Sequence, residues 1–230
     1  MTDFDLAAIV AEIAGDTPMT LVEAGSPEVA RVPEPWRAIA SSADAATRAS
    51  AAVALWNPEF LALVPRFAEV FRERLEDVRV CRLGDDWVLL YLAGDSPEGH
   101  VAWIGWEPGG TTTQAPFWEA IPLPARDFLT GVHAGFTGPD WQSHGLIPPR
   151  WMQTFADWAE FDDETIEEWN DEWTVAVDRM TLVTTNASLL YHCVSPDAPG
   201  RMVLVYEGDV DDRPEFGEAL DELMSERFES

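Results

Sequence analysis

The sequence predicts an α+β protein, because helical and strand-like segments both occur and short turns join the strands. Strand-like runs lie at Val78–Leu83, Trp87–Ala93 and Val101–Trp106, and the turns Gly84–Asp86 and Gly94–Gly99 separate them. This spacing indicates an antiparallel meander. Segments with apolar residues at helical spacing stand on either side of it.

The N-terminal region is the least regular part of the chain. Asp3–Ala14 is expected to be a short helix that ends at Gly15, whereas Ala24–Ser50 is rich in Pro, Ser and Ala. The latter composition favours a loop or weak helix that serves as a linker or a packed arm. We therefore expect residues 1–50 to form a helix and a Pro/Ala-rich arm, and residues 51–230 to form one α+β domain.

A long helix is predicted from Asn57 to Leu75. Asn57 is suited to cap its first turn, and Pro58 is tolerated at its first position. Apolar residues follow at helical spacing and must be buried: Phe60, Leu63, Val64, Phe67, Val70, Phe71 and Leu75. In the meander that follows, Trp87–Ala93 is apolar on both faces, which predicts a central strand.

The second half of the chain predicts further helices and strands. The helix within Pro116–Val132 should begin near Leu123, because Pro122 and Pro124 do not fit deep inside a helix. Two more helices are expected at Pro148–Phe161 and Glu164–Trp173, and a last one after Asp212, with the apolar face Phe216, Leu220, Leu223 and Phe228. The strands between them are expected at Val175–Thr185, Ser188–Val194 and Met202–Glu207.

The two halves share a sequence pattern at a spacing of about one hundred residues. The tripeptide L-L-Y occurs at Leu89–Tyr91 and at Leu189–Tyr191, and each copy is followed by a Ser-Pro turn and later by an F-x-E-A segment. One explanation is a duplicated hairpin-plus-helix unit, spanning residues 87–130 and 187–228. The other is chance, because hairpins draw on few residue types.

The charge of the chain is strongly acidic. It carries 42 acidic residues against 14 arginines and has no lysine, so its formal net charge is −28. Such a charge argues against nucleic acid and anionic membranes as ligands, because both would repel it. It fits either a basic protein partner or solubility alone.

The sequence gives little indication of a cofactor or of a cellular compartment. Cys81 and Cys193 stand far apart and belong to no zinc-binding pattern, so no metal or other cofactor is predicted, and reduced buried thiols in a cytoplasmic protein are expected. The first residues lack the features of a signal peptide. No apolar run reaches the length of a membrane span.

The sharpest local feature is a run of acidic residues without a basic residue between Trp151 and Asp178. If the run is helical, five like-charge pairs at a spacing of four oppose the helix by roughly 1–2.5 kcal/mol. This run is either a solvated face or a docking surface that speeds association with a basic protein. The candidate binding residues are Glu160, Asp162, Asp163, Glu164, Glu167, Glu168, Asp171 and Glu172, with a second group at Asp209, Asp211, Asp212 and Glu215.

Aromatic and histidine residues give two further sets of candidates. Core packing or interface anchoring explains the helical spacing of Trp151, Trp158, Trp169 and Trp173. His192 lies in an apolar strand, where a packed histidine is common. His133 and His144 flank a Gly-rich loop, but no nucleophile or carboxylate stands at a diagnostic spacing. We therefore predict no enzyme activity, and keep a hydrolase centred on this loop as a third alternative.

Three motifs and the closing helix carry a family resemblance. They are I-P-L-P-A-R-D-F-L at Ile121–Leu129, V-H-A-G-F at Val132–Phe136, G-L-I-P at Gly145–Pro148, and the segment Glu218–Phe228. Together they resemble the SUKH superfamily, in which an Ile-Pro or Leu-Pro pair precedes a helix, a Gly-rich loop and a G-L-x-P-like segment. The resemblance covers roughly the C-terminal half. The helix and meander from Asn57 to Trp106 precede the usual family start.

The resemblance implies a twisted, mainly antiparallel sheet with helices packed around it. Many bacterial members look like immunity proteins that bind and neutralise a cognate polymorphic toxin, often a nuclease. We therefore expect a non-enzymatic immunity protein that blocks a basic protein toxin by stoichiometric binding. The alternative is a general protein-interaction or regulatory module without a toxin partner.

Overall fold

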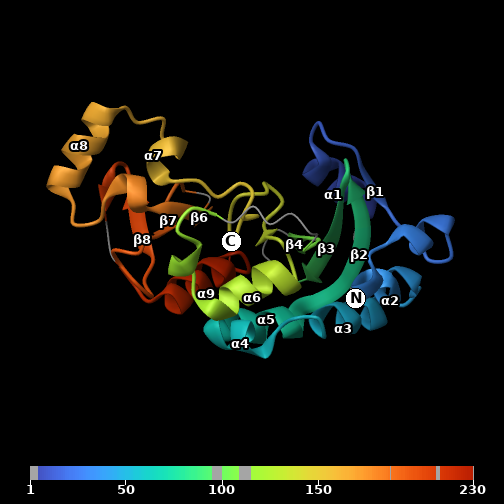
Figure 1. Cartoon of the computed structure of the whole chain (residues 1–230). Coiled ribbons are helices and arrows are strands. Elements are labelled where there is room, and N and C mark those ends of the chain that lie inside the picture. The colour runs from blue at the N-terminus through green and yellow to red at the C-terminus, as the bar shows by residue number, and fades with distance from the viewer. Residues whose placement is uncertain (1–4, 95–99, 109–114, 187, 211–212, 230) are drawn as a thin grey trace.

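The computed structural model describes residues 5–94, 100–108, 115–186, 188–210 and 213–229. Within these residues the chain forms α-helices and two antiparallel sheets, of five and four strands, which confirms the α+β prediction. Figure 1 shows the five-stranded sheet and the four-stranded sheet on opposite sides of the molecule. Several helices lie below and between them.

The larger sheet forms one wall of the main core. Its strands are hydrogen bonded in chain order: β1 (Met19–Leu21), β2 (Leu75–Leu83), β3 (Asp86–Gly94), β4 (His100–Trp106) and β5 (Phe136–Thr137). β3 is its central strand, as predicted, and every residue of β3 from Val88 onward is buried. The sheet is therefore covered on both faces.

The pleat of β3 divides its side chains between two apolar clusters. Leu89 and Tyr91 point toward the main helix layer, whereas Leu90 and Leu92 pack with α1 (Leu6–Ala14) on the other face. Helix α1 begins after Asp5, whose carboxylate accepts a hydrogen bond from the Ala8 amide (3.1 Å). The predicted N-terminal helix is thus confirmed from Leu6 to Ala14, while residues 3–4 of the prediction lie outside the described residues, and the helix covers one face of the sheet.

The segment at Ala24–Ser50 packs against the larger sheet. It forms the short helices η1 (Pro27–Arg31), η2 (Glu34–Trp36) and α2 (Arg37–Ser41), followed by α3 (Ala45–Val53). Val32, Trp36 and Ile39 of this segment are fully buried in the main core. An arm that contributes three large side chains to the core is part of the folded unit.

The main helix layer contains four helices from distant parts of the chain. They are α4 (Pro58–Leu63), α5 (Pro65–Arg74), α6 (Leu123–Gly131) and α9 (Phe216–Glu226). Helix α6 begins at Leu123, as the positions of Pro122 and Pro124 predict. Asn57 and Pro58 hold the N-cap and first positions of α4, as predicted, but the Asn57 side chain makes no capping hydrogen bond and instead donates to the Pro124 carbonyl (3.2 Å).

The single helix predicted from Asn57 to Leu75 is wrong, because it is interrupted between α4 and α5. Pro65 removes a backbone donor, and Val64 leaves the helical region at φ −126° and ψ 60°. Asp221 of α9 accepts hydrogen bonds from the amides of Arg66 (3.1 Å) and Phe67 (2.8 Å). A residue far along the chain thus supplies the cap of α5.

The smaller sheet has its own apolar cluster. It contains β6 (Thr181–Thr185), β7 (Tyr191–Val194), β8 (Val203–Tyr206) and β9 (Asp209–Val210), in that order. The short helices α7 (Phe155–Trp158), α8 (Asp163–Glu172) and η4 (Val177–Arg179) share this cluster with the sheet. The helix expected over Pro148–Phe161 is therefore only one turn long, and η4 shortens the strand expected from Val175.

An extended segment connects the two sheets. The Leu146 carbonyl accepts a hydrogen bond from Phe136 in β5 (2.8 Å), and the Ile147 amide donates to Val183 in β6 (3.0 Å). Gly145 is required here, because a Cβ atom at this position would overlap the Phe136 carbonyl oxygen. The G-L-I-P motif thus lies where the chain crosses between the sheets.

The proposed duplication stays a prediction, although its two copies differ locally. Leu89–Tyr91 lies inside the central strand β3, whereas Leu189 is a turn residue with φ 62° and a largely exposed side chain. The F-x-E-A segments also differ. The first contributes the short helix η3 (Trp118–Ala120), and the second opens α9.

Candidate functional site

The acidic segment folds into helix α8, one residue earlier than predicted. Asp162 caps the helix by accepting hydrogen bonds from the hydroxyl of Thr165 (2.7 Å) and from its amide (2.9 Å). These hydrogen bonds favour the ionised carboxylate, so the pKa of Asp162 is lowered from its ordinary value. The negative charge also interacts favourably with the N-terminal end of the helix dipole.

One face of α8 is anchored in the core of the smaller sheet. Trp169 is buried, and its indole nitrogen donates to the Val175 carbonyl (3.3 Å). The Asn170 side chain accepts a hydrogen bond from the Val177 amide (2.9 Å). Ile166 packs partly buried beside Trp169. The helix is therefore fixed against the loop that follows it.

The other face of α8 is a surface of carboxylates, which we name the α8 acidic surface. All of its predicted members are exposed: Glu160, Asp162, Asp163, Glu164, Glu167, Glu168, Asp171 and Glu172. Glu160 lies before the helix with φ 54°, so it forms no helical pair with Glu164. Four like-charge pairs remain, and they oppose the helix by about 0.8–2 kcal/mol. Burying one large apolar side chain contributes about 1.5–3 kcal/mol, so Trp169 offsets this repulsion.

Within the described chain, no ion pair with an arginine compensates the negative charge of the α8 acidic surface. Each described ion pair joins an arginine to a carboxylate elsewhere, such as Arg48 with Asp77 or Arg179 with Asp197. None involves a carboxylate of residues 160–172. The charge of this surface is therefore directed at solvent or at a partner.

The second acidic group has a different surrounding. Asp209 is exposed in β9, but Glu215 pairs with Arg201 at 2.9 Å. Asp211 and Asp212 lie outside the described residues. Arg213 stands beside them in sequence and donates to the Thr174 hydroxyl (2.6 Å). Arginines therefore offset part of the charge in this region.

The four candidate tryptophans divide between core and surface. Trp169 is buried and Trp173 is partly buried, as helical core packing predicts. Trp151 and Trp158 remain 38% and 36% exposed. Trp151 lies edge-on to the buried Trp106 at 5.3 Å. Of these two, only Trp158 packs against the apolar cluster that α8 shares with the smaller sheet, through Phe155.

His133 is a core residue. It is fully buried, and its ring nitrogens lie 2.7 Å from the Tyr91 hydroxyl and 3.3 Å from the Trp106 carbonyl oxygen. Burial lowers the pKa of His133 to about 3, so its imidazole is neutral at pH 7. Aromatic rings surround it, including Trp56 at 6.2 Å and Phe136 at 6.0 Å.

His144 and His192 are buried near the connection between the sheets. The Ser143 hydroxyl lies 2.7 Å from Nδ1 of His144, and burial lowers the pKa of both histidines, that of His192 to about 4. Ser143 and His144 are adjacent in the chain, and Asp140 accepts from the Ser143 amide (3.0 Å) and not from the imidazole. This differs from a nucleophile–base–acid arrangement, in which the carboxylate orients the histidine.

Among the described residues, no group of His, Cys, Asp and Glu is placed to hold a metal ion.

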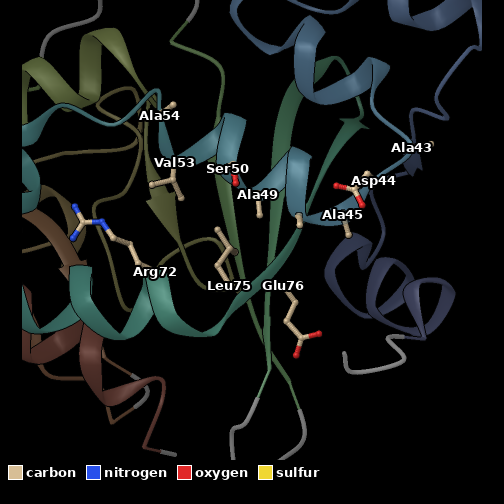
Figure 2. Close-up of a pocket in the computed structure, with 11 residues that line it drawn as sticks. Ala43, Asp44, Ala45, Ala49, Ser50, Val53, Ala54, Arg72, Leu75 and Glu76 are labelled. Carbon is tan, nitrogen blue, oxygen red and sulfur yellow. The ribbon is translucent and has the colours of Figure 1, made fainter.

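An open groove of about 880 Å³ lies between α3 and the junction of α5 with β2. Figure 2 shows Ala49, Ser50 and Val53 of α3 facing Arg72, Leu75 and Glu76. Most lining side chains are small and apolar. Helix α3 forms one side of the groove, and its sequence signal is the N-cap Asp44, whose carboxylate accepts a hydrogen bond from the Thr47 amide (2.8 Å). The Pro- and Ala-rich composition around it, which favours a loop or weak helix, obscured this signal.

Comparison with known proteins gives no assignment: no family model, no curated protein and no solved structure matches the chain. The SUKH resemblance therefore rests on the motifs alone and stays a prediction. Within the part of the chain that the structure describes, no helix is both long and apolar enough to cross a membrane.

Proposed function

We propose that this chain is a non-enzymatic immunity protein that binds a basic protein toxin stoichiometrically through the α8 acidic surface and blocks it. The observation that carries the proposal is the uncompensated charge of α8. Its carboxylates are exposed and lack arginine partners among the described residues, while Trp169 fixes the helix from below. A fixed surface of one sign accelerates association with a surface of the opposite sign.

A nuclease is the class of toxin that fits best. Nucleases present cationic groups to the phosphate backbone, and those groups are complementary to a row of carboxylates. The SUKH resemblance supports the same class. Blockade would follow because the immunity protein occupies the surface that the nucleic acid needs. We further propose that this occurs in the cytoplasm, because Cys81 and Cys193 are free and buried, as in proteins of reducing compartments.

The alternative is a general protein-interaction or regulatory module. The groove beside α3 supports it, because this groove offers a second contact surface away from α8. A basic toxin encoded next to this chain favours the immunity function, whereas its absence favours the alternative.

A toxicity assay with charge-reversed variants tests the proposal. The neighbouring basic protein is co-expressed with the wild type or with the triple variant Asp163→Lys, Glu167→Lys and Glu168→Lys. The control variant carries Glu59→Lys, Glu69→Lys and Glu73→Lys, which reverse the same number of exposed acids on α4 and α5. Net charge therefore changes equally in both.

We expect the wild type and the α4–α5 control to protect cells and to co-purify with the toxin. The α8 variant should do neither. If all three proteins protect equally, α8 is not the binding surface. If the wild type binds a neighbouring toxin without protecting against it, neutralisation is not the function.

A further inference from the structure

Trp158 and Tyr191 form an aromatic pair beside the α8 acidic surface. Their ring centroids lie 4.4 Å apart, with the planes inclined at 50°. The buried Phe155 supports both rings, at 5.4 Å from Trp158 and 5.6 Å from Tyr191. Trp158 remains 36% exposed, and Tyr191 is only partly buried. The pair is thus held from one side and open to solvent on the other.

Two other tryptophans that reach solvent, Trp87 and Trp151, are covered by arginines of the same chain. The guanidinium of Arg82 lies 4.8 Å from the Trp87 ring, and that of Arg150 lies 5.0 Å from Trp151. None of the described cation–π contacts involves Trp158 or Tyr191. Among the described residues, these two rings therefore lack the cation that Trp87 and Trp151 have.

The polar groups of the two rings, and two carboxylates near Trp158 in sequence, are also available to a ligand. Within the described chain, neither the Trp158 indole nitrogen nor the Tyr191 hydroxyl makes a hydrogen bond, and the Tyr191 hydroxyl is not among the buried polar atoms that lack a partner. Two exposed carboxylates stand within two residues of Trp158, namely Asp157 and Glu160. One oxygen of Asp157 accepts from the Thr154 hydroxyl (2.6 Å), which holds this carboxylate in place.

We propose that the Trp158–Tyr191 pair binds an arginine side chain of the basic partner. A guanidinium stacks on an aromatic face and donates in a fork to a carboxylate, so a ring pair with exposed carboxylates nearby in sequence, at Asp157 and Glu160, suits it better than an ammonium. The inference rests on the proposed function and specifies it further. The acidic surface attracts any cation, whereas the ring pair selects arginine over lysine.

Two labelled peptides of equal charge test this selectivity. One alternates Arg with Gly and the other alternates Lys with Gly, and binding to the full chain is measured by fluorescence anisotropy. The wild type should bind the Arg peptide more tightly. Trp158→Leu and Tyr191→Leu should each weaken Arg-peptide binding about 2- to 5-fold, as expected for one exposed cation–π contact, and should change Lys-peptide binding less. The matched controls Trp151→Leu and Tyr206→Leu, also exposed aromatics, should change neither.

The charge variants separate this inference from the proposed function. Glu167→Gln with Glu168→Gln should weaken both peptides equally and reduce the salt dependence. If the wild type binds both peptides without preference, the proposed function survives and the arginine site is wrong. If it binds neither peptide, both are wrong.

A second measurement does not depend on the folding of the Leu variants. In protein labelled with 5-fluorotryptophan, the ¹⁹F resonance of Trp158 is assigned by its loss in Trp158→Phe. Titration with the Arg peptide should shift this resonance more than that of Trp151. An unmoved Trp158 resonance at saturating peptide would overturn the site.

Discussion

The Arg48 guanidinium and the Asp77 carboxylate form a two-pronged ion pair, with both nitrogen–oxygen distances at 2.7 Å. Each side chain is only 10% exposed. Arg48 belongs to α3 in the N-terminal segment, and Asp77 belongs to β2. The pair therefore ties a segment of arm-like composition to the larger sheet, and the sequence neighbours Ala49 and Glu76 line the groove of Figure 2.

Removing one partner of this pair should be costly. Arg48→Met leaves the Asp77 carboxylate buried without its cation, and we expect the free energy of unfolding to fall by about 3–5 kcal/mol. The double variant Arg48→Met, Asp77→Asn should lose less than the sum of the two single variants. Urea denaturation of the four proteins measures this. Additive losses would mean that the pair contributes no coupling.

Because two histidines are buried in the neutral form, the folded protein should lose stability as the pH falls. The pKa values of His133 and His192 are lowered to about 3 and about 4, whereas an unfolded histidine titrates near 6.5. Below pH 6.5 the unfolded chain binds protons that the folded chain excludes, so stability decreases as the pH falls toward 4. His192→Gln should reduce this slope by up to about 1.4 kcal/mol per pH unit. Parallel stability curves for wild type and variant would contradict the assignment.

Close approach at Gly145 predicts a severe defect from a single methyl group. A Cβ there would overlap the Phe136 carbonyl oxygen, which belongs to the backbone and cannot rotate away. Gly145→Ala should therefore destabilise the protein by about 1–3 kcal/mol or more. The control is Gly131→Ala at the end of α6, where a Cβ atom would meet nothing within 4 Å beyond its chain neighbours and the backbone of its own helix. Thermal unfolding should show no loss in the control, and equal behaviour of both variants would contradict the crossing geometry.

Local sequence patterns predicted those elements whose burial is decided by near neighbours. β3 reads as a central strand because it is apolar on both faces, and α8 reads as a helix because Trp169 recurs with Ile166 and Trp173 at helical spacing. In each case the pattern itself is the physical cause of the burial.

Contacts between distant segments explain what the patterns missed. Asp221 lies more than 150 residues from the helix end that it caps, and no local signal at Pro65 indicates that partner. The buried position of His133 depends on Tyr91 and on the carbonyl of Trp106, which arrive from two strands. The link between the two sheets likewise joins distant segments, because the chain next to Gly145 hydrogen-bonds to Phe136 of one sheet and Val183 of the other.

Reversing one charge on α8 should separate stability from binding. Glu168→Lys converts the pairs with Glu164 and Glu172 from repulsion to attraction, so at low salt the free energy of unfolding should rise by about 0.8–2 kcal/mol. Added salt should diminish this gain. The same change removes a carboxylate that the proposed partner needs, so association with a basic peptide should slow while the protein becomes more stable. Urea denaturation and stopped-flow association rates measure the two effects, and an unchanged association rate would mean that α8 is only a solvated face. The wild-type chain keeps this charge repulsion along a helix that Trp169 anchors, so it is less stable than the variant. A loss of stability of this kind is expected where residues serve binding.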